Sequence, residues 1–300
     1  MLIFVDKVVI ILYGTFPKIM LYIVATPIGN LQDITIRALK ILRKVDYIFA
    51  EDTRVVKKLL GAYKIFNKKV ESLHKFNEIK KTHKVIELLG KNIDVAVVSD
   101  AGTPLISDPG KDLIKICFEK NIEIIPVPGV SALTTILSVT PFDNKEFVFV
   151  GFLDKSPVKR EKRLVKLLME GKNIFFFEAP TRFLDTLKII EKIDKNLKLI
   201  VGRELTKKFE EIIYDRVKNL VNYYSKKEPK GEFTAGIENT FKKKEDYEED
   251  IEILKKLNFS NKEIINFVTE KYKISKNKVY NLLKSWKKFH LKILMQKNQL

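Results

Sequence analysis

The sequence predicts an α/β protein with two successive α/β domains and a small helical domain at its C-terminal end. Apolar runs of strand length alternate with amphipathic helical patterns over residues 21–138. After residue 143 the extended segments lie closer together, and from residue 246 onward the patterns are helical only. Strands that alternate with helices are typical of a mostly parallel sheet covered on both faces. The closely spaced extended segments indicate that the second sheet is mixed.

The first domain is expected to cover residues 20–143. Its strands are predicted at 21–26, 46–50, 94–99 and 122–125. Its helices are predicted at 34–45, 55–61, 78–90, 109–120 and 130–138. The first helix repeats apolar residues every three or four positions, which places them on one face. We expect Asp33 to cap the N-terminus of that helix.

The second domain is expected to cover residues 144–240. Its strands are predicted at 146–152, 173–178, 197–202, 209–215 and 232–238. Its helices are predicted at 157–170, which is basic, and at 182–192. The charged residues 242–246 predict a solvated linker to the helical domain.

The helical domain, residues 246–300, has helix-turn-helix spacing, with helices predicted at 248–257, 261–271 and 276–288. Ser260 and Glu263 have the arrangement of a capping box. The third helix carries Tyr280, Lys284, Trp286, Lys287 and Lys288. No acidic residue occurs from Lys271 to the end of the sequence. A basic final helix suits nucleic-acid recognition, and a helical cap on the main body is the alternative.

Residues 1–19 are expected to be an extension outside the fold. The apolar run at 8–13 is too short to span a bilayer, and no convincing signal-peptide cleavage site follows it. Met20 directly precedes a clean apolar strand, so we expect the folded protein to begin there.

The charge balance indicates a polyanionic partner such as nucleic acid. The 300 residues include 56 Lys and Arg against 38 Asp and Glu, a formal net charge of +18. Codon bias toward lysine is the competing explanation. A single cysteine, Cys117, excludes a disulfide within the chain, fits the cytoplasm and is expected to be a core residue. The three histidines lack metal-ligand spacing, and no metal site is predicted.

Three strand ends carry loops rich in Gly and Pro, at residues 25–30, 97–110 and 127–132. In open α/β sheets, ligands bind at the carboxyl ends of the strands. We therefore expect the three loops to converge on one small-molecule site. Asp100 directly follows the second strand end, where it can accept hydrogen bonds from a hydroxyl or an ammonium group. The predicted helix start at 129–132 offers N–H groups to an acceptor.

Eight segments in order carry a resemblance to a known family. They are residues 21–33, 50–54, 98–104, 126–132, 149–153, 178–182, 202–207 and 230–232. Together they resemble the tetrapyrrole methylase superfamily of S-adenosylmethionine (SAM) methyltransferases, and within it the members that modify 16S rRNA. The helical tail is similar to the small C-terminal domain of those members. No glycine-rich dinucleotide or phosphate loop is present, which disfavours a Rossmann methyltransferase or an oxidoreductase.

The resemblance implies two α/β domains that bind SAM in the cleft between them, and a homodimer. It implies in-line transfer of a methyl group, without a metal, to the ribose 2′-oxygen of a cytidine in 16S rRNA (cytidine 1402 of the decoding centre) within the small ribosomal subunit. The cofactor-binding positions that it implies are Pro27, Ser99, Asp100, Thr103, Ser131, Ala132, Glu178 and Leu205.

The residues that would assist the transfer are less narrowly defined. A 2′-hydroxyl is a poor nucleophile, so a general base or a polarising cation is expected. The candidates follow two strand ends: Glu51, Asp52 and Arg54, and Arg203, Glu204 and Lys207. The alternative is that these residues only brace the cleft through salt bridges.

RNA contacts are expected in the basic segment after residue 153. Its candidate phosphate contacts are Lys159, Arg160, Lys162 and Arg163, together with Arg182. Phe152 is a candidate for stacking on an unpaired base. Two other functions stay open: a methylase of the same fold with another substrate, and a non-catalytic RNA-binding factor.

Overall fold

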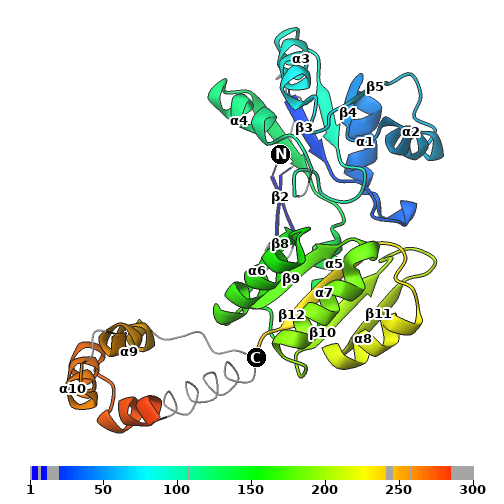
Figure 1. Ribbon diagram of the computed structural model, residues 1–300. Coiled ribbons are helices and arrows are strands. Elements are labelled where there is room, and N and C mark those ends of the chain that lie inside the picture. The colour runs from blue at the N-terminus through cyan, green and yellow to red at the C-terminus, as the bar shows by residue number, and fades with distance from the viewer. Residues whose placement is uncertain are drawn as a thin grey trace. The chain divides into compact units, whose positions relative to one another are not determined.

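The computed structural model describes residues 2–5, 8–11, 20–106, 108–240, 246–256 and 259–284. The chain divides into two compact units. The first unit comprises residues up to 161 and 173–238, and the second comprises 162–172 and residues from 239 onward. The first unit contains two five-stranded sheets (Figure 1). Among the described residues, every helix is too short or too polar to cross a bilayer.

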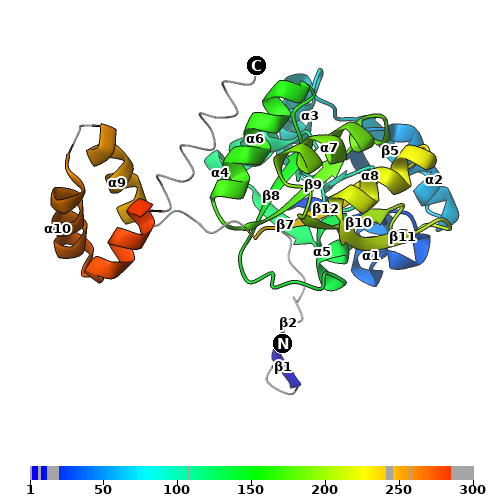
Figure 2. The ribbon, with the colours of Figure 1, turned by 60° about the horizontal axis from the view of Figure 1, so that its bottom comes forward.

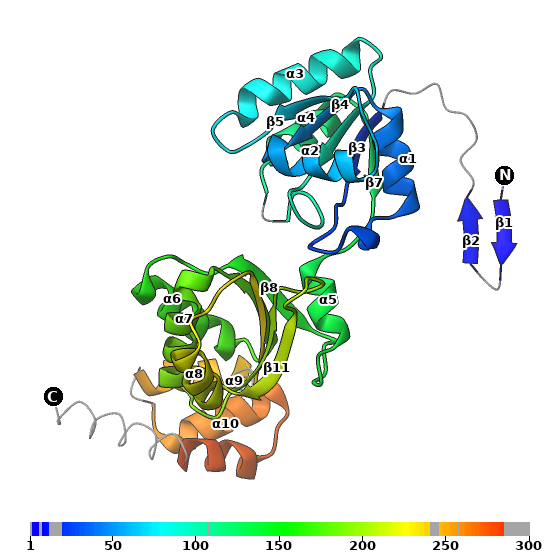
Figure 3. The same cartoon turned by 90° about the vertical axis from the view of Figure 1, so that its right-hand side faces the viewer.

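The sequence predicts a mostly parallel first sheet, and all its described strand pairs are parallel, in the order β5-β4-β6-β3-β7. Its strands are β3 (Met20–Val24), β4 (Tyr47–Ala50), β5 (Lys69–Ser72), β6 (Val95–Val98) and β7 (Glu123–Val127). Helices α1 (Ile36–Lys44) and α2 (Thr53–Ala62) pack on one face. Helices α3 (Glu78–Gly90) and α4 (Lys111–Glu119) pack on the other (Figure 3). Both faces are thus covered, and Cys117, a residue of α4, is fully buried in the core.

The second sheet is mixed, as predicted, with strand order β11-β10-β12-β9-β8. Its strands are β8 (Phe147–Phe152), β9 (Asn173–Glu178), β10 (Lys198–Arg203), β11 (Glu211–Arg216) and β12 (Phe233–Glu238). Only the β8–β9 pair is parallel among these described strands. Helices α7 (Pro180–Ile193) and α8 (Val217–Lys226) lie along one face (Figure 2). Helix α5 (Ala132–Ser138) contributes Ile136 to an apolar cluster with Phe175 and Ile200 of this sheet.

Three local features differ from the sequence expectations. Asp33 does not cap α1: it ends a short 3₁₀ helix (Leu31–Asp33), and the Thr35 side chain accepts the capping hydrogen bond from the Ala38 amide at 3.0 Å. Strand β5 was missed because its four residues are polar or half-buried. Helix α8 was missed although Val217, Leu220 and Tyr224 form a readable buried stripe.

The segments before β3 and after β12 form further elements. Strands β1 (Leu2–Val5) and β2 (Val8–Ile11) pair with each other as an antiparallel hairpin. That residues 1–19 lie outside the functional fold stays a prediction. In the second unit, α9 (Asp246–Lys256), α10 (Asn261–Tyr272) and a third helix at 276–284 share an apolar core. The predicted capping box of Ser260 and Glu263 is present.

Trp286, Lys287 and Lys288 fall outside the described residues, as do most of the predicted linker residues 242–246. Recognition of nucleic acid by the third helix stays a prediction. Helix α6 (Pro157–Met169) begins in the first unit and ends in the second.

Glu211 on β11 holds α8 to the second sheet. Its carboxylate accepts hydrogen bonds from Tyr223 at 2.7 Å, Tyr224 at 3.1 Å and Lys227 at 2.8 Å. Partial burial opposes ionisation, but these donors outweigh it and lower the pKa of Glu211 from 4.5 to about 2.

We expect Glu211→Gln to lower the free energy of unfolding at pH 7 by about 1–2 kcal/mol, because charged hydrogen bonds are lost. A depressed native pKa stabilises the fold above the unfolded pKa, and this contribution disappears as the pH falls from 4.5 to about 2. Urea unfolding of both proteins at several pH values measures the difference. A difference that stays constant through that window would contradict the assignment.

Candidate active site

The three loops rich in Gly and Pro are joined to one another by hydrogen bonds at the carboxyl edge of the first sheet. Thr26 and Gly102 exchange two backbone hydrogen bonds, of 2.9 and 3.0 Å. The Thr26 hydroxyl also donates to the Ser99 carbonyl at 2.9 Å. Thr103 donates to the Val130 carbonyl at 3.4 Å, which links the second loop to the third. The parallel register thus brings together three segments that are far apart in sequence.

Gly102 is required at the centre of this junction. Its φ of +83° lies in the left-handed region, which side chains with a Cβ rarely adopt. A Cβ at this position would also lie 3.2 Å from Cγ2 of Ile28. The absence of a side chain therefore lets the second loop approach the first.

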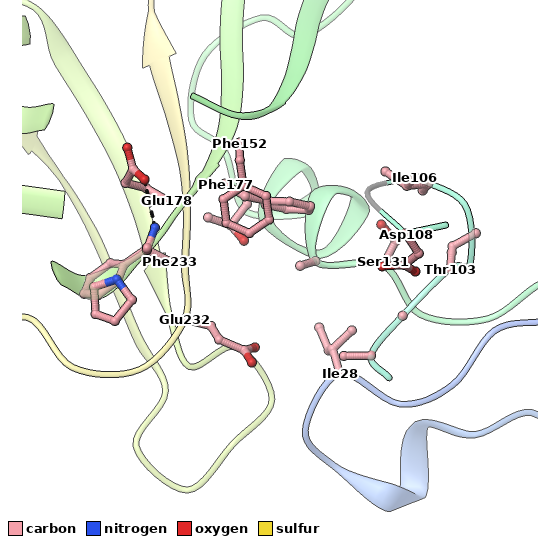
Figure 4. Close-up of a pocket in the computed structure, with 16 residues that line it drawn as sticks. Ile28, Thr103, Ile106, Asp108, Ser131, Phe152, Phe177, Glu178, Glu232 and Phe233 are labelled. Atoms are coloured by element: carbon pink, nitrogen blue, oxygen red, sulfur yellow. Dashed lines mark hydrogen bonds between the residues drawn. The ribbon is translucent and has the colours of Figure 1, made fainter. Parts of the chain in front are cut away.

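A pocket of about 360 Å³ lies where these loops face the second sheet (Figure 4). The loops contribute Ile28, Ala101, Gly102, Thr103, Ile106, Asp108, Ser131 and Ala132. The second sheet and its loops contribute Phe152, Phe177, Glu178, Ala179, Pro180, Glu232, Phe233 and Thr234. Its volume is in the range of small-molecule sites.

Aromatic side chains form much of the wall on the side of the second sheet. Phe152 and Phe177 contact each other edge to face, with ring centroids 5.7 Å apart. A register shift in β8 precedes Phe152, next to Gly151 at φ +63°. Phe152 is consequently half exposed at the pocket instead of packing within the sheet. This wall offers a flat apolar surface to a ring or to a cationic group.

Glu178 lines the pocket, and its carboxylate is buried in a network of charges. Its carboxylate accepts hydrogen bonds from Arg182 at 2.6 Å, Thr186 at 2.8 Å and its neighbour's amide at 2.9 Å, and it pairs with Arg160 at 3.3 Å. Figure 4 shows the bond to the Ala179 amide. With four partners, this carboxylate is saturated and acts as a structural anchor of the wall.

The family model of tetrapyrrole (corrin/porphyrin) methylases matches residues 20–221. The chain belongs to this family. Two curated relatives are both named ribosomal RNA small subunit methyltransferase I. The protein from Borrelia garinii subsp. bavariensis is 46% identical over 217 residues, which cover 72% of this chain and 96% of the relative. The protein from Thermotoga maritima is 45% identical over 216 residues, with the same coverage.

A solved cobalamin biosynthetic enzyme, cobalt precorrin-4 methyltransferase, has the same fold as this methylase. The two chains superpose with a TM-score of 0.57 over 72% of this chain and 94% of that one, at 17% identity. The predicted fold class and membership of the tetrapyrrole methylase family are thus confirmed.

The predicted cofactor positions of the methylase divide into two groups. Thr103, Ser131, Ala132 and Glu178 line the pocket. The other four do not line it: Pro27, Ser99 and Leu205 are buried, and Asp100 is half-buried.

Asp100 joins the segment that follows β6 to the segment that follows β4. Its carboxylate accepts a hydrogen bond from the Asp52 amide at 2.9 Å. Burial, with the charges of Asp52 and Asp108, raises the pKa of Asp100. That Asp100 binds the cofactor stays a prediction.

Two acidic residues of the pocket were missed, Asp108 and Glu232. Asp108 belongs to the second loop, and burial raises its pKa. Glu232 precedes β12 in a segment that carried the family resemblance. It follows Gly231, whose φ is +91°. The available signals were a Gly turn directly before β12 for Glu232, and a place in the Gly- and Pro-rich loop between β6 and α4 for Asp108.

The catalytic candidates have different protonation properties. Desolvation and the charges of Asp108 and Asp100 raise the pKa of Glu51 and make it a better base. Arg54 pairs with Asp52 at 2.6 Å and lowers the pKa of that carboxyl to about 2. Lys207 lies 2.9 Å from Glu204 and 3.2 Å from Glu232. Burial opposes its charge, but these acids raise the pKa of Lys207, so it is a cation and not a base.

The bracing alternative also has support in these contacts. Arg203 pairs with Glu211 at 3.4 Å, and Glu204 exchanges hydrogen bonds with the backbone of Glu232. Glu204 and Thr206 have positive φ values of 51° and 67°. The Asn30 amide donates to the Thr206 hydroxyl at 3.1 Å, which ties this loop to the first sheet.

The structure corrects one RNA-binding candidate, Arg160. It is 1% exposed and its guanidinium is bonded to Glu178 and Thr186, so it cannot reach a phosphate. The spacing Arg160, Leu164 and Leu168 marks one buried stripe of α6, which the sequence could have revealed. Lys159 and Lys162 are exposed, Arg163 is half-buried, and Arg182 is partly exposed beside Glu178.

Proposed function

We propose that this methylase transfers the methyl group of SAM to the ribose 2′-oxygen of a cytidine in the decoding centre of 16S rRNA. The observation that carries the proposal is the pocket at the carboxyl edge of the first sheet, in a chain that matches 96% of a relative named ribosomal RNA small subunit methyltransferase I. Ligands of open α/β sheets bind at this edge. The substrate is the small-subunit rRNA within the cytoplasm, and a homodimer is the expected assembly.

The pocket fits SAM in volume and in chemistry. The hydroxyls of Thr103 and Ser131 offer partners to polar groups of the ligand, and the Ser131 side chain does not cap α5. Phe177 and Phe233 offer apolar surface to the adenine ring. Bound there, SAM supplies an activated methyl group on a sulfonium sulfur. Among the described residues no cluster of acids, histidines and cysteine could hold a metal ion.

The protein's main contribution is alignment of the 2′-oxygen with the methyl carbon and the sulfur. Alignment of this kind can lower a barrier by about 7–11 kcal/mol. Glu51 accepts the proton of the 2′-hydroxyl, because it follows β4 next to the pocket loops and is the candidate carboxylate whose pKa is raised. Lys207 remains charged and orients Glu232 at the pocket.

The exposed face of α6 is the proposed RNA surface. Lys159, Lys162 and Lys166 recur at helical spacing and are exposed. The helix begins five residues after Phe152, the half-exposed aromatic residue of the pocket. Lysines on one helix face can position phosphates, while an aromatic side chain stacks on a splayed base. The helical tail provides a second basic element for the same substrate.

We expect the double variant Lys159→Glu/Lys162→Glu to raise the KM for RNA at least about tenfold. Each substitution replaces an attractive contact with a phosphate by repulsion. The dissociation constant for SAM should stay unchanged. Lys188→Glu on α7 is the matched control, since Lys188 is also an exposed lysine on a helix. If the double variant and Lys188→Glu change the KM for RNA equally, α6 is not the RNA surface.

Incubation of the full chain with labelled SAM and 30S subunits tests the proposed function. Mass mapping of the labelled rRNA should locate one methyl group on the ribose of a decoding-centre cytidine. A methyl group on a base, or label in another molecule but not in rRNA, would refute the assignment.

A further inference from the structure

The pocket has a charge opposite to that of the chain. Although the chain carries a net charge of +18, the described residues that line the pocket include three acids and no lysine or arginine. Glu178 is neutralised by Arg160 and Arg182 behind the wall. Asp108 and Glu232 therefore remain as the acids whose charge acts on a ligand.

These two carboxylates come from opposite sides of the pocket. Figure 4 shows Asp108 beside Ser131 and Thr103, and Glu232 extending from the side of the second sheet. The Glu232 side chain is 72% exposed, and its one described ion pair is with Lys207 at 3.2 Å. Since Lys207 also pairs with Glu204, its charge is shared between two carboxylates. The negative charge of Glu232 is thus only partly neutralised by Lys207, and it can attract a positively charged ligand in the pocket.

Aromatic rings add to this preference for a cation. Phe152 and Phe177 both line the pocket, on the same side as Glu232. The face of an aromatic ring attracts a positively charged group, and rings of this kind recognise quaternary ammonium ligands. Two acids and two aromatic side chains therefore surround space suited to a compact cation with apolar substituents.

We infer that Asp108, Glu232 and the rings of Phe152 and Phe177 recognise the positive charge on the sulfur of SAM, and so favour SAM over S-adenosylhomocysteine. This inference rests on the proposed function. In the transfer, the methyl–sulfur bond breaks and its electron pair stays on sulfur, which becomes a neutral thioether. The 2′-oxygen forms the new bond to carbon and gives up its proton to the base. The product therefore lacks the positive charge that the pocket recognises, and this favours its release.

Calorimetric titration of the full chain with SAM and with S-adenosylhomocysteine tests the inference. Glu232→Gln keeps the shape of the side chain and removes its charge. It should weaken SAM binding about fivefold and S-adenosylhomocysteine binding less than about twofold, because only SAM carries the sulfonium. Lys207→Met removes the cation that partly neutralises Glu232, so it should shift the ratio of the two affinities toward SAM. Methionine keeps the Cγ that packs against Gly29.

Glu228→Gln is the matched control, because Glu228 is a 78% exposed acid in the same segment and does not line the pocket. It should leave both affinities unchanged. If Glu232→Gln weakens both ligands equally, or neither, the inference is wrong while the proposed function stands. If the unmodified protein binds neither ligand, the proposed function itself is wrong.

Discussion

Replacement of Glu51 by glutamine should lower kcat/KM for RNA methylation by about 10²–10⁴-fold, the usual contribution of a positioned general base. Glutamine has nearly the same shape, so the dissociation constant for SAM should change less than about twofold. Glu51 follows β4 at the carboxyl edge of the first sheet, within the electrostatic reach of Asp100 and Asp108. This position next to the pocket loops is the reason for the prediction.

The pH dependence provides a second test of the same residue. Desolvation and the charges of Asp108 and Asp100 raise the pKa of Glu51, whereas His74 acts in the opposite direction. A base works when it is deprotonated, so kcat/KM should rise with pH through this raised pKa and then level off. Glu51→Gln should abolish that rise. Glu87→Gln, which removes an exposed acid from α3, should keep both the rate and the profile. An unchanged rate for Glu51→Gln would exclude it as the base.

Replacement of Arg160 by alanine should lower the free energy of unfolding by about 3–5 kcal/mol. Both Arg160 and Glu178 are almost completely buried, with side-chain exposures of 2% and 0%. Removal of the guanidinium leaves a cavity and a buried carboxylate that has lost one of its two cations. Because Arg182 still pairs with Glu178, we expect a value near the lower end of the range.

The neighbouring ion pair of Glu161 and Lys192 provides the control for this experiment. Lys192 is 72% exposed, and an exposed pair contributes less than about 1 kcal/mol. Urea unfolding of Arg160→Ala and Lys192→Ala should therefore give clearly different losses. A loss below 1 kcal/mol for Arg160→Ala would show that the buried network does not anchor the pocket wall.

The features that the sequence predicted well are those set by local pattern. Apolar strands such as β6 and amphipathic helices such as α3 follow from periodicity alone, and the sheet order then brings the three loops together. The polar edge strand β5 lacks an apolar run and was missed for that reason.

The site was harder to predict because burial depends on contacts between distant segments. Arg160 and Lys159 are neighbours in sequence, yet one is buried against Glu178 and the other is exposed. Composition alone predicts the same RNA-binding role for both residues. Only the helical spacing of the buried residues of α6 distinguishes the buried one from the exposed one. Asp108 and Glu232 lie far apart in the chain, and their common pocket is visible only in the fold.

A crystal structure of the full chain with S-adenosylhomocysteine tests the central claim most directly. The ligand should lie in the pocket between Thr103, Ser131 and Ala132 on one side and Phe177 and Phe233 on the other. A ligand bound anywhere else in the chain would contradict the assignment of this pocket as the methyl-donor site.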